Sequence, residues 1–380
     1  MKNDDLTILQ SASERDVRLF HMLGCTVLAD EKMLHNLKKN ENIKTYIVTE
    51  PTDAFPFLHE GAVMEFHGKL FAAWYNNQKF ELTGRTPVRF SVSEDNGKTW
   101  SPPITVADDE SRKILYCPPV FGIDKNTLYM FINQMVKADH IHSLDLYAYN
   151  QTETRFEPVW SRPLPFKLNT NVYTLPSGKL MICGRTGDLD GFPATPAVLI
   201  ADSGKIDSDW RIVKIQKNPF LPDGRKYEHP ETSAILCGNE IVVFCRNDYS
   251  DMPIFYVSKD EGETWSAPKI HNIPFHNSKI YAGVLSDGRY YCIGNIDSDR
   301  TKLAIFFSEK KELKFEKGFL LQEGDSSYRE TSGIWHYPCA CEFENRLYIV
   351  YSADFKSDGT CSKRGLVISV VDTNDIDKPL

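Results

Sequence analysis

The chain has 380 residues, of which 41% are hydrophobic, 12% aromatic and 25% charged, and its formal net charge is −8. This composition is typical of a soluble globular protein, and the negative charge argues against nucleic acid or an anionic membrane as partner. No apolar run approaches the roughly 20 residues that a membrane span needs, so we expect no membrane insertion.

The N-terminus, Met1–Asp5, is polar and has neither the apolar core nor the small-residue cleavage site of a secretory signal. The nine cysteines include no CxxC pair, and several lie in apolar segments. We therefore expect buried free thiols in a reducing cytoplasm, with a secreted protein that has lost its signal as the alternative. The cysteines in apolar segments are Cys183, Cys237, Cys245, Cys292, Cys339 and Cys341.

Residues 1–43 precede the repeated part of the chain, and we expect them to form an N-terminal extension. Asp30–Asn42 has a helix-forming composition, which predicts a short surface helix. Lys44–Glu50 alternates in the manner of a strand.

From there on, two apolar strands joined by a tight turn recur with a period of about 50 to 60 residues. The turns contain Ser-Gly, Asp-Gly, Gly-Asn or Glu-Asn pairs, which favour hairpins. A third apolar strand follows each hairpin. The hairpins cover Gly61–Tyr75, Pro119–Asn133, Val172–Arg185, Ser233–Arg246, Ala282–Asn295 and Ala340–Ser352. The third strands are Val88–Ser93, Leu144–Tyr149, Ala197–Ala201, Ile254–Ser258, Lys302–Ser308 and Gly365–Val371.

This period is that of a β-propeller blade with its loops. A single blade cannot bury both faces of its sheet, so blades pack side by side and close a ring. We predict an all-β fold with six four-stranded antiparallel blades, a single domain over residues 44–380. Lys44–Glu50 is expected to supply the fourth strand of the last blade, which would close the ring and remove an open edge.

Two segments, Ser93–Trp100 and Ser258–Trp265, share the pattern S-x-D-x-G-x-x-W, called an Asp-box. The Asp should accept backbone N–H groups, the Gly should adopt a left-handed conformation, and the Trp should pack between sheets. We interpret both boxes as structural turns, away from the chemistry.

Propeller geometry brings distant residues together at one end of the central channel. The innermost strands begin there, and the loops after the second strands return there. Together these positions are unusually rich in titratable groups, which indicates a binding or active site. The strand starts carry His59, Glu60, Tyr116, Cys117, His229, Glu231, Lys279, Trp335, His336 and Tyr337, and the second-strand ends carry Glu81, Arg85, Arg185, Arg246 and Arg300.

Arg185, Arg246 and Arg300 occupy similar positions in three blades. A guanidinium group pairs bidentately with a carboxylate, so the three suggest an acidic sugar such as a sialate, another ulosonate or a uronate. The structural alternative is that each arginine holds its own loop through a nearby aspartate. Those aspartates are Asp188, Asp248 and Asp297.

Over roughly residues 45–371 the chain resembles the sialidase superfamily of Asp-box propellers. The resemblance implies that Tyr337 is the nucleophile, that Glu231 supports it, and that Arg246 and Arg300 hold the substrate carboxylate. Glu81 stands where the family has its general-acid Asp, with Asp53 and Glu60 as rivals. The Arg-Ile-Pro motif that supplies the family's first arginine is absent, so the resemblance implies an acidic sugar without specifying sialic acid.

His59, His229 and His336 each precede a first strand and are candidates for acid, base or sugar contacts. Trp335, beside His336, is a candidate to stack on a sugar, and Arg85 is a candidate for substrate binding. His140-Ile-His142 has no third ligand beside it, so we expect no metal ion and no cofactor.

Three functions therefore remain open at this stage. The first is a retaining exo-glycosidase that removes a terminal acidic sugar from an oligosaccharide. The second is a polysaccharide lyase or a His-dependent glycosidase on the same propeller, and the third is a non-catalytic carbohydrate-binding propeller.

Overall fold

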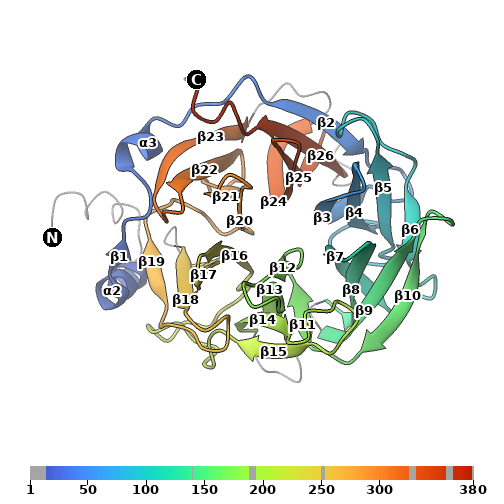
Figure 1. The fold of residues 1–380 in the computed structure, drawn as a ribbon, viewed down its shortest axis with the longest axis horizontal. Coiled ribbons are helices and arrows are strands. Elements are labelled where there is room, and N and C mark those ends of the chain that lie inside the picture. The colour runs from blue at the N-terminus through green and yellow to red at the C-terminus, as the bar shows by residue number, and fades with distance from the viewer. Residues whose placement is uncertain are drawn as a thin grey trace.

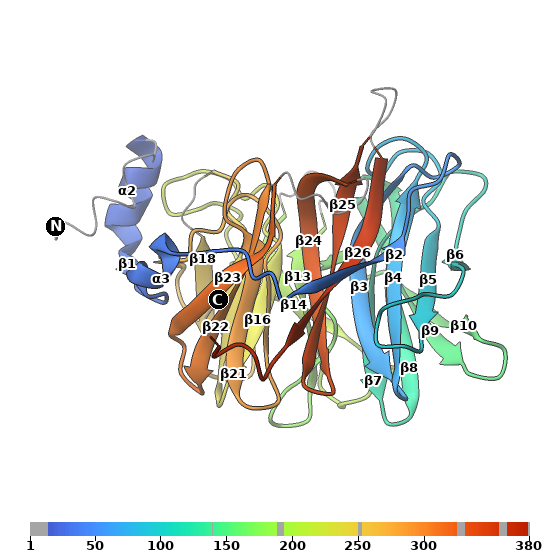
Figure 2. The same cartoon turned by 90° about the horizontal axis from the view of Figure 1, so that it is seen from above.

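The computed structural model describes residues 14–138, 140–187, 194–249, 253–324, 331–356 and 363–378. The paired strands in this part of the chain fall into six consecutive antiparallel groups, which we call blades I to VI. Figure 1 shows the blades arranged around a central axis, with the first strand of each nearest to it. Figure 2 shows the strands standing roughly along that axis.

The blades are built from strands that follow one another in the sequence. Blade I comprises β3 (Phe57–Phe66), β4 (Lys69–Asn77), β5 (Val88–Ser93) and β6 (Ile104–Ala107). Blade II comprises β7 (Leu115–Asp124), β8 (Thr127–Lys137), β9 (His140–Asn150) and β10 (Arg155–Arg162). Blade III comprises β11 (Phe166–Leu168), β12 (Tyr173–Thr174), β13 (Leu180–Thr186), β14 (Pro196–Ala201) and β15 (Arg211–Lys214). Blade IV comprises β16 (Thr232–Cys237), β17 (Glu240–Cys245), β18 (Ile254–Ser258) and β19 (Lys269–His271). Blade V comprises β20 (Tyr281–Val284), β21 (Arg289–Asn295), β22 (Lys302–Lys310) and β23 (Phe315–Glu323). Blade VI comprises β24 (Thr331–Phe343), β25 (Arg346–Phe355), β26 (Lys363–Asp372) and β2 (Lys44–Thr49).

The middle strands of a blade are buried on both faces because the neighbouring blades cover them. In blade III all six residues of β14 are buried, whereas the outermost strand, β15, has none that is buried. Middle strands are therefore continuous apolar runs, whereas outer strands such as β15 mix polar and apolar residues. This explains why all six predicted hairpins and third strands are confirmed, while the expected fourth strands of blades I to V were not located in the sequence. These fourth strands are β6, β10, β15, β19 and β23.

The first and last segments of the propeller itself meet at blade VI. β2 pairs antiparallel with β26, where Lys44–Glu50 was expected, and Thr45 Oγ1 lies 2.9 Å from Ser369 Oγ. β26 also meets β3, with Arg364 opposite Phe57, so blades VI and I belong to one continuous sheet.

The N-terminal extension packs on the outside of blades IV and V. After α2 (Glu14–Leu23), β1 (Cys25–Thr26) runs parallel to β19. The helix expected over Asp30–Asn42 is shorter, because α3 (Glu31–His35) starts at an Asp30 cap and stops where the chain turns to bond with Leu320 of β23. Neither helix has the length and apolar character of a membrane span among the described residues.

Both Asp-boxes have the expected turn geometry. In the second box, Ser258 Oγ accepts from Gly262 N at 2.8 Å, and Asp260 Oδ1 accepts from Thr264 N at 2.8 Å. Gly262 has a φ of +87°, and the carbonyl of Gly262 accepts a hydrogen bond from Trp265 Nε1 at 3.0 Å. Trp265 packs on the apolar cluster shared by blades III and IV, so the box fastens two blades together.

The first strand of blade III differs from the prediction. It is split into β11 and β12, because the segment between them uses side chains to bond neighbouring blades. Asn171 Oδ1 accepts from Phe121 N, and its Nδ2 donates to Val63 O at 2.9 Å. Blade III therefore reaches blades I and II near the axis, and its inner strand starts at Phe166, before the predicted hairpin start at Val172.

The eight described cysteines are all free thiols. Cys183, Cys245, Cys292 and Cys339 are buried, as expected, whereas Cys237 and Cys341 are only half-buried.

Candidate functional site

Three residues from two blades meet at one guanidinium nitrogen. Glu231 lies directly before β16 and Arg246 directly after its partner β17, and Arg246 N bonds to Glu231 O at 2.9 Å. This hairpin closure sends both side chains to the same end of blade IV. Arg246 Nη1 donates to Glu231 Oε2 at 2.9 Å and to Tyr337 Oη at 2.8 Å. The predicted nucleophile, its supporting carboxylate and one predicted arginine are therefore in direct contact.

Tyr337 reaches this point because β24 is irregular. The pairing with β25 shifts between His336 and Cys339, and Tyr337 has a φ of +51°. A left-handed conformation is costly for an aromatic residue and clusters at functional sites. The bulge turns the phenol toward blade IV.

The surroundings shift the pKa values of Tyr337 and Glu231 in opposite directions. Burial raises the pKa of Tyr337 well above its ordinary value, the Glu231 carboxylate adds to this, and Arg246 opposes it. Burial also raises the pKa of Glu231, but the charge and hydrogen bond of Arg246 outweigh burial and bring it below its ordinary value. At neutral pH the pair is thus a neutral phenol beside an ionised carboxylate.

Two more cations and a neutral ring surround the phenol. The Arg300 guanidinium lies 5.6 Å from the ring centroid of Tyr337, and Lys279 Nζ lies 5.8 Å from it. The ring of His59 lies 4.4 Å from that of Tyr337. Burial lowers the pKa of His59 well below its ordinary value, and nearby Arg364 acts in the same direction. His59 is therefore a neutral ring against which Tyr337 packs.

A buried charge cluster from three further blades lies next to this group. Glu60, on β3, is 3.7 Å from Lys167 Nζ and 3.6 Å from Lys279 Nζ. Cys117 of blade II donates its thiol to Glu60 at 3.5 Å. Each blade thus contributes a residue from the start of its inner strand to one connected cluster. The six are Glu60, Cys117, Lys167, Glu231, Lys279 and Tyr337.

Glu81 lies in the exposed loop after β4, close to this cluster. Its Oε1 accepts from Tyr75 Oη at 3.4 Å, and its charge contributes to the raised pKa of Tyr337. A carboxyl group that is open to solvent and near the phenol is in a suitable place for a general acid.

His229 and Asp248 form a second hydrogen-bonded pair at the rim. Asp248 Oδ2 accepts from His229 N at 2.9 Å and lies 3.1 Å from His229 Nδ1, while its Oδ1 accepts from Arg246 Nε at 2.6 Å. With Glu228 these side chains offer three ligand atoms within 4.8 Å of one another, a spacing that a metal ion can use. Both carboxylates already accept hydrogen bonds, Asp248 from Arg246 and Glu228 from Tyr249.

Four of the predicted site residues are buried in this structure. Trp335 has an exposure of 0% and packs edge-on against Tyr351, so it is a core residue and not a sugar platform. Glu60 is 1% exposed and belongs to the buried charge cluster. His59 and Arg185 are 1% and 2% exposed and present almost no surface to a ligand.

Two other predicted residues have local structural partners. Arg85, a predicted substrate contact, donates to Asp108 and Glu110 in the loops of blade I. His336 contacts Arg300 through Nδ1 at 3.0 Å and Asp354 through Nε2 at 3.2 Å. Asp188, the expected partner of Arg185, lies outside the described residues.

Three residues of the site, Lys167, Asp354 and Arg364, were not predicted. Lys167 was missed because the split inner strand of blade III starts earlier than the hairpin pattern indicates. Asp354 and Arg364 flank the end of the β25–β26 hairpin, and this position at a second-strand end is the signal that would have found Asp354.

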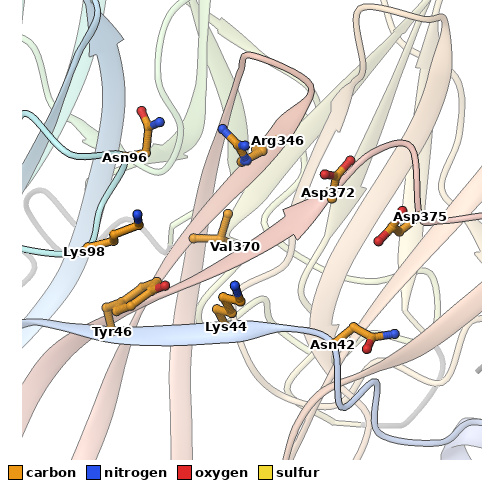
Figure 3. Close-up of a pocket in the computed structure, with 9 residues that line it drawn as sticks. All are labelled: Asn42, Lys44, Tyr46, Asn96, Lys98, Arg346, Val370, Asp372 and Asp375. Atoms are coloured by element: carbon orange, nitrogen blue, oxygen red, sulfur yellow. The ribbon is translucent and has the colours of Figure 1, made fainter.

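The cavity in Figure 3 lies at the other end of blade VI. It has a volume of about 320 Å³, and Lys44, Lys98 and Arg346 line it together with Asp372 and Asp375. Arg346 pairs with Asp372 at one end of the β25–β26 ladder, whereas Asp354 and Arg364 pair near the other. This cavity is therefore separate from the charged cluster around Tyr337.

The fold is that of a sialidase-like β-propeller. The chain belongs to the BNR repeat-like domain family, whose sequence profile matches residues 68–349, well over half of the chain. None of the curated proteins compared with this chain matches it.

Three solved structures illustrate the similarity of fold. A protein of unknown function from Dyadobacter fermentans superposes with a TM-score of 0.67 at 13% identity, over 87% of this chain and 99% of that one. The K499G mutant of the NanB sialidase from Streptococcus pneumoniae gives 0.63 at 11% identity, over 91% of this chain and 73% of that one. An α-L-arabinofuranosidase from Fusarium graminearum gives 0.58 at 16% identity, over 88% and 99%.

Proposed function

We propose that this protein is a retaining exo-glycosidase that removes a terminal acidic sugar from an oligosaccharide, with Tyr337 as nucleophile. One observation carries the proposal: Arg246 Nη1 donates both to Tyr337 Oη and to Glu231 Oε2. A phenol, a carboxylate able to take its proton and a cation able to stabilise the phenolate therefore stand together.

In the first step the Tyr337 oxygen attacks the anomeric carbon and the bond to the leaving-group oxygen breaks. The phenol proton passes to Glu231, and Glu81 protonates the leaving oxygen. In the second step water attacks the same carbon and gives a proton to Glu81, while Glu231 returns its proton to the departing Tyr337 oxygen. Two displacements at one carbon retain the configuration.

The charges favour an acidic substrate. Arg246 donates to the Tyr337 hydroxyl, and Arg300 and Lys279 lie over its ring, in a chain whose net charge is −8. Arg246 and Lys279 are paired with carboxylates, whereas Arg300 contacts a neutral histidine and a backbone carbonyl. A sialate, another ulosonate or a uronate brings a carboxylate that a guanidinium group can bind bidentately. A tyrosine nucleophile suits such a substrate, because a neutral phenol repels an anion less than a carboxylate does. The fold shared with a sialidase is consistent with this choice.

A second candidate, a uronate lyase, is favoured by the pair of His229 and Asp248. Asp248 Oδ2 lies 3.1 Å from His229 Nδ1, an arrangement that orients an imidazole for acid–base chemistry. His229 is exposed at the rim. In a lyase it would take the C5 proton of a uronate while an arginine neutralises the carboxylate, and the C4–O4 bond would break to leave a double bond.

The test is turnover of a defined panel by the full chain: a 4-methylumbelliferyl sialoside, the matching glucuronide, and saturated uronide oligomers. We expect hydrolysis of an acidic glycoside, with the retained anomer appearing first by NMR. Tyr337→Phe and Glu231→Gln should abolish it, and Tyr129→Phe, on β8 of blade II, serves as matched control. Ultraviolet absorbance from an unsaturated product that requires His229 would instead establish the lyase. Full activity of Tyr337→Phe would overturn the proposal.

A further inference from the structure

Arg300 is held over the ring of Tyr337 from two sides. Its Nη1 lies 3.0 Å from His336 Nδ1, and its Nη2 donates to Asn277 O at 3.0 Å. Its backbone is fixed as well, with a φ of +59° and its carbonyl accepting from Trp335 N at 3.0 Å. These contacts join the loop after β21 to the start of β24.

The contact with Arg300 determines the tautomer of His336. A guanidinium group has donors and no acceptor, so His336 Nδ1 must be the acceptor. The proton of the neutral ring then lies on Nε2, which donates to Asp354 Oδ1 at 3.2 Å. Both ring nitrogens are occupied, so neither is open to a substrate in this arrangement.

Asp354 is itself fixed at the junction of the last and first blades. Arg364 Nε donates to Asp354 Oδ1, and the Arg364 guanidinium lies 4.4 Å from the ring centroid of Phe57. Arg364 also pairs with Phe57 through its backbone and bonds to Pro56 O at 2.8 Å. The chain of contacts Arg364–Asp354–His336–Arg300 therefore runs from the β26–β3 junction to the phenol.

We propose that His336 is a neutral positioning residue, locked as the Nε2–H tautomer by Asp354 and Arg364, which holds Arg300 in place for the acidic group of the substrate. The acidic substrate that Arg300 would bind is taken from the proposed function, whereas the contacts of His336 do not depend on it. The sequence had suggested a catalytic acid or base at His336, and the geometry assigns a different task.

A charged His336 would disrupt this arrangement. The groups facing it are Arg300 from the loop after β21, Asp354 on β25, Arg364 on β26 and His59 on β3. A proton on Nδ1 would point at the Arg300 guanidinium, and only Asp354 would favour it. Burial lowers the pKa of His336 to about 4, against the effect of Asp354, so the ring stays neutral at pH 7.

The first test needs no substrate. Long-range ¹H–¹⁵N spectra of the ¹⁵N-histidine-labelled full chain report the tautomer of each ring, and His336→Gln identifies the His336 signals. We expect a neutral Nε2–H ring at pH 7 that remains neutral at pH 5.5. A proton on Nδ1, or titration near pH 6.5, would overturn the proposal.

The second test uses the acidic glycoside identified by the panel above. Gln offers one acceptor and one donor, so His336→Gln should keep kcat within about threefold, while His336→Ala should raise KM about tenfold through a misplaced Arg300. A catalytic acid or base would instead lose about 10² to 10⁴ in kcat in both variants. The exposed His67→Gln is the control. If no glycoside is turned over, the proposed function fails, and the spectra alone decide the role of His336.

Discussion

Glu60 Oε2 and Lys279 Nζ lie 3.6 Å apart, and their side chains are 0% and 4% exposed. Lys167 Nζ lies 3.7 Å from the other carboxylate oxygen. Burial raises the pKa of Glu60, and the two ammonium groups oppose burial. A buried charge without a partner lowers the stability of the folded state. The contribution of each of these three residues, from blades I, III and V, therefore depends on the other two.

Removing one of these charged partners should therefore destabilise the whole propeller. We expect Lys279→Met to lower the free energy of unfolding by about 3–5 kcal/mol, because Glu60 keeps only one cation. Adding Glu60→Gln should restore part of that loss. Urea unfolding of the two variants measures both effects.

The matched control is Lys69→Met, which breaks an ion pair with Glu94 at the surface. Exposed pairs contribute little, so this variant should unfold close to the wild type. If Lys279→Met were as stable as Lys69→Met, the buried cluster would not be coupled in the way that its distances indicate.

The protein should lose stability in mild acid. Burial lowers the pKa of His271 to about 3 and of His336 to about 4, and it lowers that of His59 well below its ordinary value. In the unfolded chain these residues titrate near about 6.5. Between about pH 6.5 and 4 the unfolded state thus binds more protons, and each histidine should cost up to about 1.4 kcal/mol per pH unit on acidification.

His271 separates this effect from the candidate site, because it packs among phenylalanines of blade IV and beside Phe275. His271→Gln should reduce the slope of unfolding free energy against pH between 6.5 and 4 and leave turnover unchanged. The exposed His67→Gln should leave the slope unchanged. Equal slopes for wild type and His271→Gln would show that burial does not keep His271 neutral.

The inner part of the fold could be predicted from the sequence, whereas the outer part could not. Third strands such as Ile254–Ser258 carry continuous apolar runs because two neighbouring blades bury them. Outer strands such as Arg211–Lys214 have one exposed edge and little apolar pattern, so nothing in their sequence separates them from loops. The N-terminal strand Lys44–Thr49 was placed because the ring requires a fourth strand beside β26.

The same limit applies to the candidate site. Tyr337 and Glu231 were found because they stand at the starts of inner strands, and Arg246 because it stands at the end of a second strand, which returns to the same end of the channel. The surroundings of each side chain could not be deduced in this way. Trp335 and Tyr337 are near neighbours in β24, and the irregular pairing of this strand with β25 gives them different surroundings. Lys167 was missed because a side-chain bond network, and not a strand pattern, divides the start of blade III.

If Glu81 is the general acid, its effect should depend on the leaving group. Glu81→Gln should slow an acidic glycoside with an alkyl or sugar leaving group by about 10² or more, because that oxygen needs a proton. The same change should slow a nitrophenyl glycoside much less, because that leaving group departs as an anion. The measurement is kcat/KM for the two substrates in each variant.

Glu110→Gln is the control for this comparison, because Glu110 is an exposed carboxylate of the same blade that pairs with Arg85. It should leave both substrates unaffected. A Glu81→Gln variant that slowed the two substrates equally would assign Glu81 to binding and leave the acid to another residue.

The Asp-box glycine Gly262 should stabilise the fold in two ways, through its backbone conformation and through the close contact that it allows between blades III and IV. Gly262 and Gly178 have φ values of +87° and +88°, so alanine at either position costs about 1–2 kcal/mol of strain. A Cβ at Gly178 meets nothing within 4 Å, whereas at Gly262 it lies 3.2 Å from Ile200 Cδ1 of blade III. Gly262→Ala should therefore lower the urea midpoint more than Gly178→Ala does. Because strain is matched, the difference reports the contact between blades III and IV, and equal midpoints would mean that the Asp-box stabilises only its own turn.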